Sequence, residues 1–437
     1  MRLRFLSGKG AAGPPGGRLQ LEPAEAAPSA PSASSRTWLP PSFIRLWAAQ
    51  TISMFGENFS GIAQAFIILK MTGSPTSMGL SMALGTLPRL LASLFGGVVV
   101  DRLERKRVLM VADIVSGCVD LVLAAVIMAG RVQVWHIYVV IATRSLARAF
   151  YDPALNSLIP ALVDRKVLVR ANATQQSALH IAAAAGPALA GVMVESAGAG
   201  PAVLLAGLTF LVSSLLLATT RASSRPTPSN KSAWQDLRAG LVYVRQRKWI
   251  LSLTVAFTFV NMVTAVRMVV MPFISRDIYG RGMIGYGLTL SAGSAGSLAA
   301  IIVLAALKRL SHKHRMVSLS IAVIALSTVG LAFCPSLEWA LPVCFVVGLT
   351  GPVMGSCANA LYQEFVPSEL MGRVFAFRAT LAMALMPLAN VAAGYASNRV
   401  GPVFTLAAAG LLSLPGVVLS LDARHAGSEV LAPAQQS

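Results

Sequence analysis

The sequence predicts an all-α integral membrane protein with twelve transmembrane helices arranged as two similar six-helix bundles. Three observations predict this class. Of the 437 residues, 55% are hydrophobic and only 12% are charged, which is too few charges to cover a soluble protein of this length. The chain also contains twelve long apolar stretches. Finally, features of its first half recur in its second half.

The apolar stretches match the roughly 20 residues that an α-helix needs to cross a bilayer. They are 44–69, 76–100, 108–129, 134–160, 171–194, 201–220, 249–274, 284–307, 316–334, 338–362, 374–396 and 402–420. Turn signals such as Gly73-Ser74-Pro75 and Gly401-Pro402 separate them. They are far longer than the about ten alternating residues of a membrane β-strand, so helices are expected.

The two halves share residues at a nearly constant spacing. Asn156, Leu158, Val163 and Arg170 recur 203 positions later as Asn359, Leu361, Val366 and Arg373. Gly200-Pro201 recurs as Gly401-Pro402. Because the matches fall at equivalent places between predicted spans, they indicate a duplicated six-helix unit.

The basic residues behind the net charge of +19 are distributed unevenly between the two sides of the predicted membrane protein. Of the 36 Lys and Arg residues, 26 fall on the side that also holds both chain ends, 5 on the opposite side and 5 within spans. This bias predicts a multi-pass protein of the cytoplasmic (inner) membrane with both termini in the cytoplasm. It also makes nucleic acid an unexpected partner.

Five segments are expected along the chain. They are a disordered cytoplasmic N-terminal segment 1–42, a first bundle 43–220, a linker 221–248, a second bundle 249–421 and a cytoplasmic tail 422–437. Within the linker, the apolar positions around Trp234 and Leu241 share one helical face. This helix either couples the bundles at the membrane surface or is a plain connection.

Several short motifs carry a resemblance to a known family. They are Leu46-Trp47, Thr72-Gly73-Ser74-Pro75, Leu87-Pro88-Arg89, Gly97 followed by Asp101-Arg102 and Arg105-Lys106-Arg107, Asp113, and Tyr151-Asp152-Pro153-Ala154. With these motifs the chain resembles the major facilitator superfamily, and within it the macrolide-efflux and enterobactin-exporter-like group. The resemblance covers roughly residues 43–420 and implies a secondary transporter with two six-helix bundles around a shared pocket.

The resemblance also implies roles for particular residues. Spans 1, 4, 7 and 10 would line the pocket, with Phe55, Phe59, Asn261 and Phe345 as candidate cavity residues. A conformational latch on the cytoplasmic side would consist of Gly97, Asp101, Arg102, Arg105, Arg107 and Arg373. Gly186, Pro187 and Gly191 in span 5 resemble a motif of exporters, and the alternative is ordinary packing of small residues.

Charged residues inside the spans are candidates for function, because each costs about 2.5–3.5 kcal/mol to insert. Glu57 and Arg144 are both near mid-depth and are expected to meet, with Glu57 as the proton-coupling acid and Arg144 adjusting it. Arg148 and Asp152 lie on the same face of span 4 and can pair along it. Asp120 is expected to be a packing residue in a more peripheral span.

The expected function is proton-coupled efflux of a hydrophobic or amphipathic small molecule by a monomer in the lipid bilayer. Uptake of a metabolite, lipid flipping and, from a different class, a membrane sensor are the alternatives. No catalytic motif, metal-ligand pattern or phosphate loop occurs in the sequence. An enzyme is therefore not expected, and neither is a cofactor or a metal.

Overall fold

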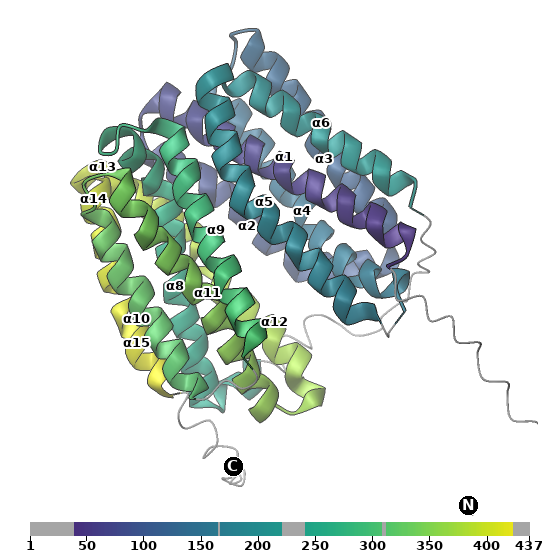
Figure 1. The fold of residues 1–437 in the computed structure, drawn as a ribbon, viewed down its shortest axis with the longest axis vertical. Helices are drawn as coiled ribbons and strands as arrows, with labels where there is room; N and C mark the ends of the chain where they lie inside the picture. Colours follow the sequence, from purple (N-terminus) through teal and green to yellow (C-terminus); the bar gives the residue numbers. More distant parts are fainter. Residues whose placement is uncertain (1–38, 165–166, 221–240, 308–311, 423–437) are drawn as a thin grey trace, which may run out of the picture. The chain divides into compact units, whose positions relative to one another are not determined.

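The structure is a computed structural model that describes residues 39–164, 167–220, 241–307 and 312–422. The described chain is helical with short connections (Figure 1). The first bundle contains α1 (Pro41–Thr72), α2 (Pro75–Arg102), α3 (Arg105–Met128), α4 (Val134–Leu162), α5 (Leu168–Ala197) and α6 (Ala199–Ala218). Residues 1–38 of the expected N-terminal segment, 221–240 of the linker and 423–437 of the tail lie outside the described residues, and α1 begins two residues before the expected boundary at 43.

The second bundle uses eight helices for six spans. They are α8 (Lys248–Asp277), α9 (Gly282–Ala306), α10 (Lys313–Ala332), α11 (Leu337–Phe365), α12 (Ser368–Ala384), α13 (Met386–Val400), α14 (Pro402–Leu412) and α15 (Leu414–Leu421). Spans 11 and 12 are each broken once, at Leu385 and Ser413. Pro387 and Pro415 follow these breaks, and a proline lacks the N–H that would continue the helical hydrogen bonds.

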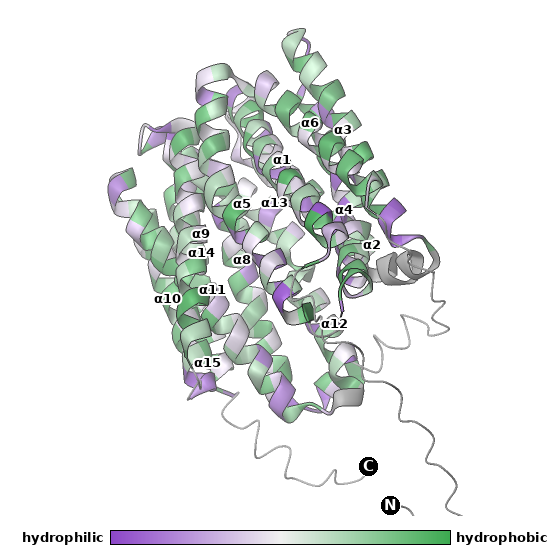
Figure 2. Ribbon diagram, turned by 45° about the vertical axis from the view of Figure 1, so that its right-hand side comes forward, coloured by the Kyte–Doolittle hydropathy of each residue, from purple (hydrophilic) through white to green (hydrophobic). Residues whose placement is uncertain are grey.

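Ten segments of the described chain are long and apolar enough to cross a membrane. Helices α2 and α4, with 28 and 29 residues, complete the twelve spans that the sequence predicts. The outward faces carry large apolar side chains such as Val122, Leu215 and Leu412, and apolar colour covers most of the helical surface in Figure 2. An apolar exterior of this extent suits lipid.

The bundles each have an apolar core, and they also share one. Phe43, Tyr151 and Leu158 belong to the core of the first bundle, while Trp249 and Tyr362 belong to that of the second. A third cluster contains residues of both bundles, such as Ile68, Met78, Phe273 and Leu337. It therefore ties the two bundles together.

The two bundles meet where α5 packs on α9 and where α2 packs on α13. We call the end of the bundles that holds Pro41 and Leu421 the terminal end, and the opposite one the far end. Hydrogen bonds join the bundles at the far end, where Asn398 donates to Thr76 Oγ1 at 2.6 Å and Thr76 donates to the Gly394 carbonyl at 3.3 Å. The far end is thus a closed contact.

Glu195, at the end of α5, makes a further contact at the far end. Its Oε1 accepts the backbone N–H of Met283 at 2.6 Å, in the first turn of α9. A helix N-terminus favours a carboxylate, because its first N–H groups have no partner within the helix. The sequence does not single out Glu195, since its partner is 88 residues away.

Candidate functional site

Glu57 and two arginines form the centre of a charged cluster in the first bundle. Glu57 is 16 residues past Pro41 in the 32-residue helix α1 and so lies near its middle. Its Oε2 accepts a hydrogen bond from Arg148 Nε at 3.0 Å and lies 3.3 Å from a terminal nitrogen of Arg144. Both arginines come from α4. The structure therefore brings Glu57 and Arg144 together at mid-depth.

The Glu57 side chain is 49% exposed, whereas that of Arg144 is only 6% exposed. Glu57 contacts α4 through its carboxyl group, and about half of its side-chain surface is not covered by the packed core. Arg144 lies deeper, with its guanidinium over the ring of Phe210 at 5.0 Å. The acid is accessible while its partner is enclosed.

Asp120 belongs to this cluster, which corrects the expectation that it is a peripheral packing residue. Its carboxylate is completely buried in α3 and lies 3.5 Å from a terminal nitrogen of Arg144. Arg144 also donates to the hydroxyl of Ser60. The expectation was wrong because α3 packs directly against α4 and presents this side chain to it.

Asp113, about two turns earlier on α3, is a second buried carboxylate of the cluster. It accepts hydrogen bonds from Ser53 at 3.1 Å and from Ser213 at 2.6 Å. Ser53 in turn accepts from Arg148 at 2.8 Å. The sequence showed Asp113 only as part of a family motif. Its contacts require α1, α3 and α6 to come together.

The expected pair of Arg148 and Asp152 along α4 does not form. Arg148 turns toward Glu57 and over the ring of Tyr151 at 4.4 Å, and Asp152 pairs with Arg89 of α2. Spacing along one helix only permits a pair, and here each residue has a partner on a neighbouring helix. With side chains 48% and 52% exposed, the Arg89–Asp152 pair contributes about 0–1 kcal/mol.

The cluster has more acids than bases. It contains the carboxyl groups of Glu57, Asp113 and Asp120 and the guanidinium groups of Arg144 and Arg148, while the neighbouring Arg89–Asp152 pair is neutral in itself. If all are ionised, one negative charge is in excess. Binding of a single proton balances the charges of this cluster, which is the change that a proton-coupled site needs.

The latch residues are placed only in part. The side chains of Gly97, Asp101 and Arg102 lie outside the described residues, although their backbone is the end of α2. Arg105 donates to the Ser157 carbonyl at 3.0 Å, and Arg107 pairs with Glu104 at 2.6 Å. Arg373 lies on α12 and is partly buried. The assembled latch stays a prediction.

The small residues of the exporter-like motif lie where the bundles touch. A Cβ atom at Gly191 would lie 3.1 Å from the Ile284 Cα on α9, and the Pro187 carbonyl packs against Gly287 of α9. A Cβ atom at Gly186 would instead meet the Asn58 side chain on α1 at 2.8 Å. The motif is thus a close-packing surface between α5 and its neighbours.

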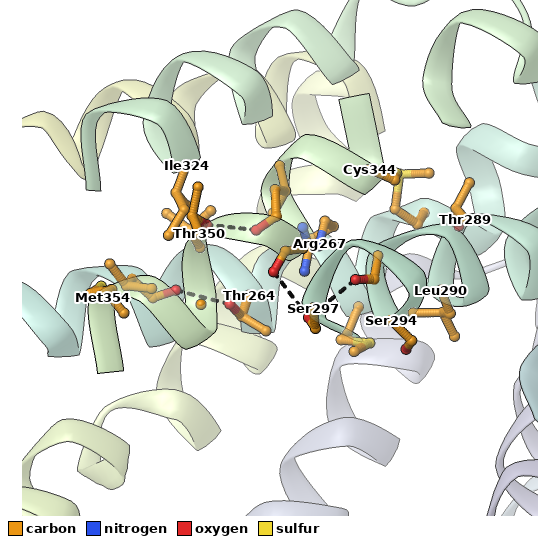
Figure 3. A pocket seen from close by; sticks show the side chains of 18 of the residues that line it. Thr264, Arg267, Thr289, Leu290, Ser294, Ser297, Ile324, Cys344, Thr350 and Met354 are labelled. Carbon is orange, nitrogen blue, oxygen red and sulfur yellow. Dashed lines mark hydrogen bonds between the residues drawn. The ribbon is translucent and has the colours of Figure 1, made fainter. Parts of the chain in front are cut away.

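The second bundle contains a cavity of about 280 Å³ among α8, α9 and α11 (Figure 3). None of the expected cavity residues lines it. Phe59 is buried in the shared apolar cluster and Phe55 packs against that cluster. Asn261 donates to the Ala382 carbonyl at 2.9 Å, and Phe345 is largely on the outside of α11. These expectations used span membership alone, and the rotation of each helix about its axis decides which residues face a cavity.

Comparison with known proteins identifies the family. The family model described as transmembrane secretion effector matches residues 36–435. The chain belongs to this family of the major facilitator superfamily. The chain is also similar to macrolide efflux protein A of Streptococcus pyogenes, which is 24% identical over 364 residues covering 82% of this chain and 90% of the relative.

Further relatives match over a similar length. Multidrug efflux pump Tap of Mycolicibacterium fortuitum is 25% identical over 394 residues, which cover 88% of this chain and 95% of the relative. Tap of Mycobacterium tuberculosis is 27% identical over 394 residues, covering 88% and 92%. The expected family is thereby confirmed.

The fold is also that of a solved transporter. A bacterial homologue of the human lysosomal transporter Spinster, in an inward-facing and unoccupied conformation, superposes with a TM-score of 0.64 at 14% identity. The match covers 90% of this chain and 98% of that chain. In the described residues, no group of three or more His, Cys, Asp or Glu side chains could hold a metal ion.

Proposed function

We propose that this protein exports an apolar or amphipathic small molecule across the cytoplasmic membrane in exchange for protons. The observation that carries the proposal is the mid-depth cluster around Glu57, with one carboxyl group more than it has guanidinium groups and with Glu57 partly accessible. Relatives of similar length are named as macrolide and multidrug efflux proteins, which supports export of drug-like molecules.

Alternating access supplies the mechanism. The bundles meet at the far end, and the charge bias of the loops supports a cytoplasmic position of the terminal end. Opening and closing of the two ends in turn would carry the molecule outward and a proton inward. The protein acts as a monomer in this proposal, because each chain has both bundles.

The test is transport into liposomes that contain the purified protein. A pH gradient with the interior acidic should drive accumulation of a fluorescent amphiphile that has no titratable amine inside the liposomes, and a protonophore should abolish it. Equal accumulation with and without the pH gradient would contradict proton exchange. Accumulation driven only by a gradient of the opposite sign would instead indicate uptake together with protons.

The latch gives a separate prediction. In the proposal, Asp101 meets the start of span 11 when the terminal end is closed, where the helix dipole and Arg373 favour an anion. Asp101→Ala should therefore lower the turnover number at least about tenfold with ligand affinity changed less than about threefold, as expected for a group that acts in one conformation. Parallel measurements of initial transport rate and equilibrium binding check this, and equal losses in both would contradict it.

A further inference from the structure

Arg267 of α8 lies at the cavity of the second bundle (Figure 3). It is ten residues before Asp277, the end of the helix, so it lies about 15 Å from that end. This depth is within the hydrocarbon region of a bilayer, which is about 30 Å thick. An arginine here is a candidate for function, because its charge is costly to hold without an anion.

No acidic residue of its own bundle serves as that anion. The sequence has no Asp or Glu between Asp277 and Glu338, and the only acid within the predicted spans of its second half is Glu338, at the very start of span 10. In the described part of the chain, the Arg267 guanidinium makes no hydrogen bond, ion pair or ring contact. Arg378, also inside a span of this bundle, differs because it donates to Asn359 at 3.1 Å and stacks on aromatic rings.

The other polar groups around the cavity leave Arg267 as its main available donor. Thr264, Thr289 and Thr350 line the cavity and donate their hydroxyl hydrogens to backbone carbonyls of their own helices. The Ser297 hydroxyl, also at the cavity, is within donating distance of the Gly293 carbonyl of its own helix at 3.1 Å and of the Gly348 carbonyl of α11 at 3.0 Å. The oxygens of these hydroxyl groups remain as acceptors only. A guanidinium has five N–H donors in a planar fork that fits a carboxylate or a phosphate.

We propose that this cavity binds an anionic group, a carboxylate or one of similar shape, on an amphipathic molecule. Arg267 is the residue that recognises the anion. Apolar side chains, among them Met268, Leu290 and Val347, line the rest of the cavity and would contact the apolar part. The inference rests on the proposed function in identifying this molecule with the exported one.

The size of the cavity fits this role. Its volume of about 280 Å³ is near the lower limit of about 300 Å³ for small-molecule pockets. It therefore accommodates the charged group and the part of the molecule next to it. The remainder of a larger molecule would extend beyond the cavity.

Equilibrium binding with two matched probes tests the proposal. The probes are 11-(dansylamino)undecanoic acid and its methyl ester, whose fluorescence is titrated with the full-length protein in lipid nanodiscs at pH 8. Arg267→Gln should raise the Kd of the acid at least about tenfold and that of the ester less than about twofold, since a charge-assisted bidentate contact is lost. Because the Kd of each probe is compared between variants in the same lipid, the partition of that probe into lipid is the same in both measurements and does not affect the ratio.

The control variant is Arg276→Gln, which makes the same change of charge on the same helix outside this cavity. It should leave both Kd values unchanged. Arg267→Lys keeps the charge without the planar fork and should raise the Kd of the acid by a smaller factor. If the glutamine variant does not fold, the lysine variant is measured in its place. Similar effects of Arg267→Gln on both probes, no effect on either, or failure of the wild-type protein to bind both would overturn the proposal.

Binding is measured without a gradient, so it is independent of proton coupling. A protein that binds the acid through Arg267 but accumulates nothing under an imposed pH gradient would contradict the proposed function. The anion site would still stand.

Discussion

Replacing Glu57 by glutamine should abolish the coupling of protons to transport. Glutamine keeps the size of the side chain but carries no exchangeable acidic proton, and Arg144 and Arg148 lose their shared partner. Proton release upon addition of the exported molecule to reconstituted liposomes should fall at least about tenfold, because a group at this depth exchanges protons only through a dedicated site. A pH-sensitive dye inside the liposomes measures it.

Two variants control this experiment. Glu57→Asp keeps an acid beside both arginines and should retain measurable coupling. Asp152→Asn makes the same acid-to-amide change in the half-exposed pair with Arg89 and should have little effect on coupling. Unchanged coupling in Glu57→Gln would refute the assignment, and attention would then move to Asp120, the buried acid next to Arg144.

Replacing Gly394 by alanine should shift the protein toward conformations in which the far end is open. A Cβ atom at Gly394 would lie 2.9 Å from the Thr76 Cα and 3.1 Å from the Pro75 carbonyl carbon on α2. Backbone atoms cannot give way as a flexible side chain does. Overpacking of this kind costs about 1–3 kcal/mol, which corresponds to a roughly 5- to 150-fold change in the ratio of the two conformations.

Spin labels at Lys70→Cys and Arg399→Cys report on this shift in a variant without the native cysteines. Both positions are exposed at the far end, one in each bundle. The distances between labels should become longer in Gly394→Ala. Gly61→Ala is the matched control, since a Cβ atom at Gly61 meets nothing within 4 Å. Identical distance distributions in the two variants would contradict the prediction.

Local chemistry was enough to place most helices. Gly73 takes a left-handed conformation with φ 56° after α1, and Pro75 begins α2, as expected of this turn signal. Gly401 and Pro402 separate α13 from α14 in the same way. The break at Ser413 was not expected. Hydropathy alone does not report it, because the apolar stretch continues through the break.

The candidate site was only partly predictable. The depth of Glu57 and Arg144 along their helices placed both at the middle of the bilayer, and the resemblance placed their spans side by side. The partners of Arg148, Asp152 and Asp120 depend on which neighbouring helix offers the nearest opposite charge. The residues that line the cavity of the second bundle, Arg267 among them, depend in the same way on helix rotation. The phenylalanines expected in a pocket shared by the two bundles stay a prediction.

The sequence by itself determined that the chain is a membrane protein with twelve apolar spans in a duplicated arrangement, and which charged residues lie inside them. These properties follow from composition and position along the chain, since a bilayer requires long apolar helices and penalises each charge within them. Only the tertiary structure decided which charges pair, where the bundles touch and that Arg267 lines a cavity with no ion pair among the described residues. Those outcomes depend on distances of a few ångströms between helices far apart in sequence, and packing alone sets such distances.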